Sequence, residues 1–157
     1  MRVRRAIPSD IPQIRKLDKQ AATAAHWTAE QYEAMFSPGA PERLILVAAN
    51  DANEATLHGF LIARCLPDEW EIEDVVVDGN RRRQGIARSL IEELTRAAGS
   101  AGVLSVILEV RESNLPAVRL YESIGFKEEG RRKHYYRSPA EDALLYRLTL
   151  HFCDKIP

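Results

Sequence analysis

The chain has 157 residues, of which 45% are hydrophobic and 29% are charged, and its formal net charge is −1. A chain of this length and composition can bury the core of one globular domain, so we expect a single domain over residues 1–157. The near-neutral charge disfavours a dedicated nucleic-acid-binding protein, which is usually strongly basic. No apolar run approaches the roughly 20 residues that span a bilayer, and the N-terminus lacks the apolar core of a secretion signal. We therefore expect a cytoplasmic protein without a nucleic-acid or membrane partner.

Metal ligands are not grouped in this sequence. The four histidines are scattered, and the two cysteines, Cys65 and Cys153, fit no zinc or redox spacing. We therefore expect no metal site.

The N-terminal region predicts a short strand and two helices. Residues 3–7 alternate as a strand does, and Ser9 and Asp10 are candidate caps of the helix that follows. That helix carries three apolar residues on one side, namely Ile11, Ile14 and Leu17. Thr28 and Gln31 have the spacing of a capping box, which predicts a second short helix up to the Ser-Pro-Gly sequence beyond it.

Three strands are predicted next. Residues 43–49 and 57–66 are rich in β-branched and apolar residues, and the polar residues 50–54 between them are typical of a hairpin turn. Residues 71–78 form the third strand.

The second half alternates helices and strands. Residues 83–99 have an apolar stripe at helical spacing, with Gly99 near the end, and residues 103–110 are nearly continuously apolar, as expected for a strand buried on both faces. Residues 114–124 predict a helix that Gly125 closes. The final strands are residues 126–136 and 142–152. The order β-α-α-β-β-β-α-β-α-β-β predicts a mixed α/β domain, with a parallel pair of strands at the centre of the sheet.

The segment RRRQGIAR, residues 81–88, lies between a predicted strand and a predicted helix. The first amides of a helix have no intrahelical partner, and the helix dipole favours negative charge there. Gly85 lets the backbone approach a phosphate closely. The segment lacks the residues of a P-loop and of the dinucleotide fingerprint. It therefore predicts a cradle for an anion, with a solvated, arginine-rich helix start as the alternative.

Three motifs resemble the GCN5-related N-acetyltransferase (GNAT) family. Arg82-x-x-Gly85-x-Ala87 resembles its acetyl-coenzyme A loop. LEVRESNLPAVRLYESIGF (108–126) and GRRKHYYRSPAEDALLYRL (130–148) resemble the RimI-type subfamily of ribosomal-protein N-alpha-acetyltransferases, as does His26-Trp27-Thr28 near the N-terminus. The resemblance implies a sheet of six to seven mostly antiparallel strands, a central parallel pair and about four helices.

The resemblance also implies a role for individual residues. Acetyl-CoA would be the cosubstrate: the strand would lie along its pantetheine arm, the loop would wrap its pyrophosphate, and an asparagine would bond near its reactive end. The residues are Val75, Val76, Val77, Arg83, Gln84, Gly85, Ile86, Ala87, Arg88 and Asn114. Glu109 would be the general base and Tyr121 the general acid.

The chemistry of acyl transfer supports these two roles. A protein α-amino group has a pKa of about 7.7–8.0, so a carboxylate suffices to take its proton, directly or through water. Glu109 lies in an apolar strand, where a charge needs a reason, although an ion pair with a nearby arginine would also explain it. Tyr121 could instead be a core tyrosine of its helix. Glu71 and Glu73 are rival bases, or ligands of the substrate ammonium, and a backbone N–H within residues 75–77 is the candidate oxyanion donor.

The acceptor is predicted to be the N-terminal α-amine of a protein, and the resemblance suggests an N-terminal alanine of a small-subunit ribosomal protein. Trp27, Glu73, Tyr135 and Tyr136 are the candidate substrate-binding residues, with ordinary packing as the alternative for the aromatic ones. Because neither cysteine lies in the motifs, we expect direct attack in a ternary complex. The other functional hypotheses are acetylation of a lysine side chain or small amine, and a non-catalytic CoA-binding module.

Overall fold

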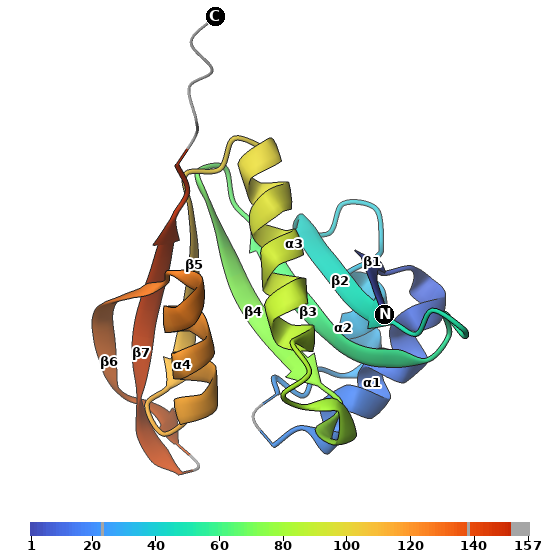
Figure 1. Cartoon of the computed structure of the whole chain (residues 1–157), viewed down its shortest axis with the longest axis horizontal. Helices are drawn as coiled ribbons and strands as arrows, with labels where there is room; N and C mark the ends of the chain where they lie inside the picture. The colour runs from blue at the N-terminus through green and yellow to red at the C-terminus, as the bar shows by residue number, and fades with distance from the viewer. Residues whose placement is uncertain (23, 138, 152–157) are drawn as a thin grey trace, which may run out of the picture. The chain divides into compact units, whose positions relative to one another are not determined.

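The computed structural model describes residues 1–22, 24–137 and 139–151, so Phe152 and Cys153 lie outside the described residues. Within these residues seven strands and four α-helices follow one another in the predicted order (Figure 1). The fold is mixed α/β, and its strands are mostly antiparallel with one parallel pair. The fold class predicted from the sequence is therefore confirmed.

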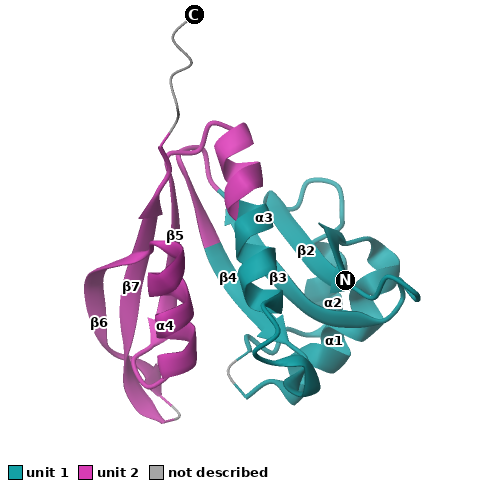
Figure 2. Ribbon diagram, in the orientation of Figure 1, with its two compact units in different colours: residues 1–65, 72–94 teal, residues 66–71, 95–157 magenta. Residues whose placement is uncertain are grey.

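The chain divides into two compact units (Figure 2), which are described separately. The first comprises residues 1–65 and 72–94, and the second comprises residues 66–71 and 95–157.

In its described residues, the first unit consists of a sheet and three α-helical segments. Its strands lie in the order β1, β2, β3, β4, and β2 pairs antiparallel with both β1 and β3. The strand bounds are Arg2–Arg5 for β1, Arg43–Ala49 for β2, Leu57–Cys65 for β3 and Glu69–Val77 for β4. The helices are α1 (Ile11–Gln20), α2 (Ala29–Ala34) and the first part of α3 (Ile86–Ser100).

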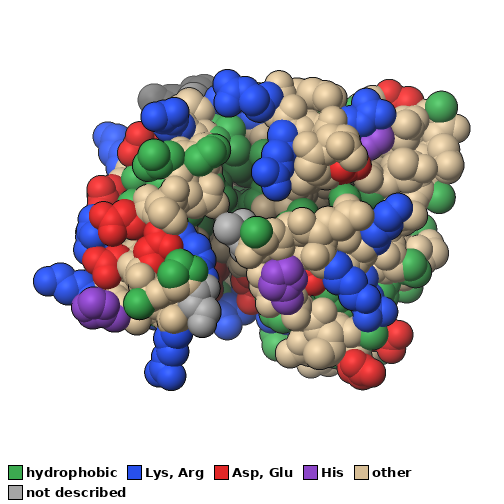
Figure 3. All heavy atoms as spheres, turned by 90° about the horizontal axis from the view of Figure 1, so that it is seen from below, with side chains coloured by type: hydrophobic (Ala, Val, Ile, Leu, Met, Phe, Trp, Pro, Cys, Tyr) green, Lys and Arg blue, Asp and Glu red, His purple; other side chains and the backbone are tan. Residues whose placement is uncertain are grey.

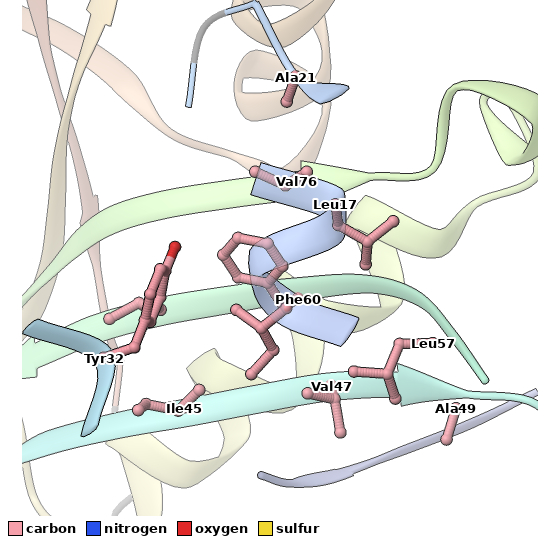
Figure 4. Packing of buried hydrophobic residues seen from close by; sticks show 11 residues of the cluster. Leu17, Ala21, Tyr32, Ile45, Val47, Ala49, Leu57, Phe60 and Val76 are labelled. Atoms are coloured by element: carbon pink, nitrogen blue, oxygen red, sulfur yellow. The ribbon is translucent and has the colours of Figure 1, made fainter. Parts of the chain in front are cut away.

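The core of the first unit lies between α1, α2 and one face of the sheet. Figure 4 shows its side chains, among which Phe60 and Tyr32 are fully buried. The other buried members are Ile14, Leu17, Ala21, Ile45, Val47, Ala49, Leu57, Ile62 and Val76. Burying one large apolar side chain contributes roughly 1.5–3 kcal/mol, so this cluster fixes both helices on the sheet.

The start of α1 corrects one expectation. We expected the Ser9–Asp10 pair to cap this helix, but Asp10 makes no capping hydrogen bond. Its carboxylate instead accepts the N–H of Ile7 and pairs through two bonds with Arg4, at 2.8 and 3.0 Å. A charge-assisted hydrogen bond from a cation on β1 stabilises this buried carboxylate more than a bond from a neutral helix amide would. The predicted capping box of α2 is confirmed, because Thr28 and Gln31 exchange both hydrogen bonds.

The second unit contains a three-stranded antiparallel arrangement in the order β5, β7, β6. The bounds are Ser105–Arg111 for β5, Leu115–Ile124 for α4, Lys127–Arg137 for β6 and Ala140–Thr149 for β7. As predicted, Gly125 ends α4, with a φ of 114°. At the end of α3 it is Gly102, rather than Gly99, that takes a positive φ.

β5 differs from expectation in one respect. Its burial alternates, and Ile107, Glu109 and Arg111 are only partly buried. The physical reason is that Glu109 and Arg111 form ion pairs, with Arg132 and Glu141 respectively, so this face of β5 is polar.

Candidate active site

The RRRQGIAR segment forms the connection between a short 3-10 turn, Gly79–Arg81, and α3. Two of its residues have a positive φ, Arg83 at 60° and Gly85 at 79°. A side chain at Gly85 would be strained by that φ, yet a Cβ there would meet nothing within 4 Å. The segment therefore turns sharply and leaves open space beside Gly85.

The N-terminus of α3 lies beside this open space. The N–H of Ser89 donates to the carbonyl of Gly85 at 2.9 Å, so the peptide N–H groups of the preceding turn have no carbonyl further back in the helix to reach. Arg81, Arg82 and Arg83 are exposed, and Arg88 lies 3.8 Å from Glu92 one helical turn later. The expected anion cradle stays a prediction, which the open turn and the exposed arginines support.

β4 has one residue more than the facing stretch of β3. At one end of the hairpin Leu66 donates to the carbonyl of Glu69, and at the other Asp78 donates to the carbonyl of His58. Between these bonded pairs β3 advances by eight residues and β4 by nine. An extra residue in one strand of an antiparallel pair is a β-bulge.

The contacts of two consecutive residues locate this bulge. Glu73 binds Arg43, and Asp74 accepts the N–H of Ala25, so both side chains lie on the face of the sheet that carries α1 and α2. Neighbouring residues of a regular strand point to opposite faces. The extra residue therefore falls at Glu73–Asp74, directly before Val75–Val77, where the sequence could indicate a donor but not a bulge.

Gly59 of β3 brings three elements close together. A Cβ at this position would lie 2.7 Å from the carbonyl oxygen of Val76 and 3.2 Å from a side-chain carbon of Ile86. Only a glycine lets β3, β4 and the start of α3 approach so closely. Sequence reasoning missed this residue, whose one signal is a glycine within an otherwise apolar strand.

Glu109 lies on β5 with its carboxylate 3.1 Å from Nε of Arg132 on β6. The Glu109 side chain is 18% exposed and that of Arg132 is 56% exposed. The ion pair expected as an alternative role is thus present. Since its arginine is largely in solvent, such a pair is worth little and can open.

The predicted substrate-binding tyrosines lie beside Glu109 in the second unit. The guanidinium of Arg111 sits 4.0 Å from the ring centre of Tyr136, and that of Arg132 sits 5.4 Å from the ring centre of Tyr135. Burial raises the pKa of Tyr136 against the opposing charge of Arg111, and the charge of Glu109 adds to the rise. Figure 3 shows acidic and basic side chains mixed over this unit.

Tyr121 and Asn114 both belong to α4 and its cap. Tyr121 is 8% exposed and packs edge-on against Phe126, with ring centres 5.7 Å apart. The side-chain oxygen of Asn114 accepts the N–H of Ala117 at 3.4 Å, which makes Asn114 the N-cap of α4 and leaves its NH₂ group as a separate donor.

Trp27 and Glu73 line one cavity of about 510 Å³ in the first unit. Glu73 binds Arg43 through two bonds, at 2.7 and 3.2 Å, and both side chains are less than one fifth exposed. The remaining lining is mostly apolar and comes from α2 and the segment after it: Gln31, Ala34, Met35, Ser37, Pro38, Gly39, Ala40 and Pro41. The structure thus brings together two of the four predicted substrate-binding residues.

Two buried carboxylates near this cavity were missed. Asp18 is 2% exposed and Asp74 is 8% exposed. Burial, followed by the charge of Asp18, raises the pKa of Asp74 to about 6, against the opposing effect of backbone N–H groups from Ala25 and Val75. The sequence held a signal for Asp74, because it stands between Ile72 and Val76 at a position where the alternation of the strand predicts an apolar residue.

Two further observations concern the described residues alone. No group of three or more His, Cys, Asp or Glu side chains in them is placed to hold a metal ion. None of their helices has the length and apolar character needed to cross a membrane.

Comparison with known proteins identifies the family to which this fold belongs. Residues 11–126 match the model of the Acetyltransferase (GNAT) family. The chain belongs to this family.

Several relatives are more specific. The chain is 39% identical over 93 residues to the [Ribosomal protein bS18]-alanine N-acetyltransferase of Escherichia coli (strain K12), a match that covers 58% of this chain and 63% of that protein. It is 41% identical over 86 residues to the N-alpha-acetyltransferase RimI of Mycobacterium tuberculosis, covering 55% and 52% respectively. The chain thus spans less than two thirds of the length of these curated relatives.

Solved structures give the fold over nearly the whole chain. The crystal structure of the ribosomal-protein-S18-alanine N-acetyltransferase from Escherichia coli is similar with a TM-score of 0.84 and 26% identity, covering 99% of this chain and 97% of the other. Arabidopsis thaliana NAA60 in complex with a bisubstrate analogue has the same fold, with a TM-score of 0.81 and 22% identity over 94% and 97% of the two chains.

Proposed function

We propose that this chain is an acetyl-CoA-dependent N-acetyltransferase that acts on the N-terminal α-amine of a protein, with an N-terminal alanine of a small-subunit ribosomal protein as the preferred acceptor. The observation that carries the proposal is the likeness to the ribosomal-protein-alanine N-acetyltransferase, in sequence over 93 residues and in fold over 99% of the chain. The expectation of a cytoplasmic protein belongs to the same proposal.

The cradle fits the pyrophosphate of acetyl-CoA. Gly85 leaves open space at the N-terminus of α3, where free amides and the helix dipole favour an anion. The exposed arginines of the segment supply positive charge, with Arg83 and Arg88 assigned to the phosphates. Gln84, Ile86 and Ala87 complete this loop, Val75, Val76 and Val77 would bind the pantetheine arm, and the NH₂ group of Asn114 would bind near the thioester.

The reaction needs a base, an oxyanion donor and an acid. Glu109 takes a proton from the acceptor ammonium, directly or through water, after its weak pair with Arg132 opens. The neutral amine then attacks the thioester that acetyl-CoA supplies. A backbone N–H in Val75–Val77, beyond the bulge, donates to the negative charge that develops on the acetyl oxygen. As the C–S bond breaks, Tyr121 gives its proton to the departing thiolate, and the second proton lost by the attacking nitrogen restores the hydroxyl of Tyr121.

The acceptor is held by aromatic and charged side chains. In the first unit, Trp27 and Glu73 line the cavity of about 510 Å³, and in the second, Tyr135 and Tyr136 lie beside the residues that surround Glu109. The backbone and small side chains of an extended peptide terminus would pack against these aromatic rings.

A panel of acceptors tests this proposal. Acetyl transfer is measured with peptides that begin with alanine, with a lysine peptide whose N-terminus is blocked, and with a polyamine and an aminoglycoside. We expect kcat/KM to be at least tenfold higher for the alanine peptides. Equal rates on all acceptors would remove the N-terminal assignment, and binding of CoA without any transfer would indicate a non-catalytic module.

A further inference from the structure

Two buried carboxylates hold the segment between α1 and α2 by its backbone. The N–H of Ala25 donates to Oδ2 of Asp74 at 3.1 Å, and the N–H of His26 donates to Oδ1 of Asp18 at 3.1 Å. Two consecutive peptide groups are thus bound by carboxylates from two different elements, β4 and α1. The next residue along the chain is Trp27.

This arrangement is costly for the fold. A buried carboxylate normally needs an ionic partner, and Asp10 in the same unit has one, because Arg4 binds both of its oxygens. Asp18 lies 3.8 Å from the imidazole of His26, a side chain that is half exposed. Asp74 is held by backbone N–H groups, and burial beside Asp18 makes its negative charge unfavourable.

Trp27 directly follows the two peptide groups that the carboxylates bind. His26 has a φ of 54°, a conformation that an L residue adopts only when its surroundings hold it. The ring of Trp27 then packs edge-on against Tyr32, with centres 5.8 Å apart, and lines the cavity that also contains the Arg43–Glu73 pair. Tyr32 is fully buried, and burial together with the charges of Asp18 and Asp74 raises the pKa of its hydroxyl. Figure 4 shows Tyr32 at one edge of the apolar cluster.

We propose that Asp18 and Asp74 are positioning residues that fix the Trp27 wall of the acceptor cavity by binding the amides of Ala25 and His26. This inference rests on the proposed function, in which that cavity receives the first residues of the acceptor chain. The two carboxylates do not touch the reacting atoms. They set the affinity for the acceptor by deciding the place of one aromatic side chain.

Together, the hydrogen bonds from the amides of Ala25 and His26 to the two carboxylates are called the anchor. Protonation of Asp74 weakens this anchor. A carboxylate accepts a hydrogen bond about twice as strongly as a neutral oxygen does, so the segment is held more firmly above pH 6 than below it. The groups that face Asp74 are Asp18 of α1, His26 of the segment itself and Tyr32 of α2, with Arg15 of α1 acting on Tyr32. Glu73, next to Asp74 on β4, is paired with Arg43 of β2.

The fluorescence of Trp27 reports on the anchor without requiring enzymatic activity. The chain has two tryptophans, so the change Trp70→Phe leaves Trp27 as the only one. We expect its emission to shift with a midpoint near pH 6, and Asp74→Asn to abolish that midpoint, because an amide accepts the bond but does not titrate. His26 acts electrostatically on Asp74 and is therefore the control. A midpoint that survives Asp74→Asn and disappears in His26→Gln would overturn the proposal.

Kinetics separate positioning from folding. At pH 7.5 we expect Asp74→Ala to raise the KM for an alanine peptide about tenfold and to leave the KM for acetyl-CoA unchanged, and Asp74→Asn to restore most of the loss. The matched control is Asp10→Asn, a buried carboxylate that contacts Arg4 and Ile7 instead. It should lower the melting temperature without changing either KM.

The outcomes distinguish the two proposals. An equal rise of both KM values in Asp74→Ala, or the same KM change in Asp10→Asn, would show that Asp74 acts through general stability and would overturn the inference. If the wild-type protein acetylates no peptide N-terminus, the proposed function fails, whereas the fluorescence titration still decides whether the anchor exists.

Discussion

Replacing Asp74 by asparagine should stabilise the protein at neutral pH. The folded protein holds the pKa of this carboxyl near 6, above its ordinary value of 3.8. The folded chain therefore binds the proton more tightly than the unfolded chain does, so stability falls as pH rises from about 4 through 6. Above that window the full penalty of the buried charge remains.

The penalty can be worked out from the shift. A difference of roughly two pKa units corresponds to about 3 kcal/mol, since each unit is worth 1.36 kcal/mol. Asp74→Asn keeps the shape and the hydrogen-bond acceptor but carries no charge. At pH 7.5 it should raise the free energy of unfolding by as much as about 3 kcal/mol, and at pH 4 it should change little.

Urea denaturation at pH 4, 5, 6 and 7.5 measures this difference. With an m value of roughly 2–3 kcal/mol/M, the variant's midpoint should move up by about 1 M at pH 7.5. Asp10→Asn is the control of opposite sign. Burial tends to raise the pKa of Asp10, but the bonds from Arg4 and Ile7 outweigh it and lower that pKa. Asp10 therefore stabilises the fold at neutral pH and loses this contribution as the pH falls, so its asparagine variant should be destabilised at pH 7.5.

A gain in stability that does not depend on pH would refute this reasoning, because the expected gain arises from removing a carboxylate that is charged only at higher pH. A loss of stability at pH 7.5 would do so as well, since it would mean that the carboxylate is favourable where it lies.

The other predictions concern the site. Glu109→Gln should lower kcat at least 100-fold and leave the Kd for CoA within twofold by calorimetry; unchanged turnover would exclude Glu109 as the base. Gly85→Glu should abolish binding of CoA by calorimetry, because it adds bulk and negative charge to the cradle. Gly102→Glu is the matched control, since its φ of 76° and open surroundings are nearly the same, and equal losses in both would place the cradle elsewhere. Gly59→Ala should destabilise the fold by about 1–3 kcal/mol and raise the KM for acetyl-CoA, because its Cβ displaces the carbonyl of Val76; a normal melting temperature would contradict the close approach.

Much of the fold could be read from local patterns. The Thr28–Gln31 capping box, the apolar stripe of α3 and Gly125 after α4 each act over three or four residues, so the chain order alone reveals them. The α1 cap could not be predicted, because the partner that Asp10 takes instead is Arg4, a residue of another element.

The sequence by itself determined the class of elements, and it singled out Gly85 of the proposed cradle and the candidate base, because each depends on residue type at a fixed spacing. Tertiary structure decided what those residues touch. The bulge at Glu73–Asp74 depends on the pairing of β4 with β3, the Glu109–Arg132 pair depends on which strands adjoin β5, and the raised pKa of Asp74 depends on burial beside Asp18. A charge is costly or useful according to what surrounds it in space, and its surroundings are assembled from segments that the chain order keeps far apart.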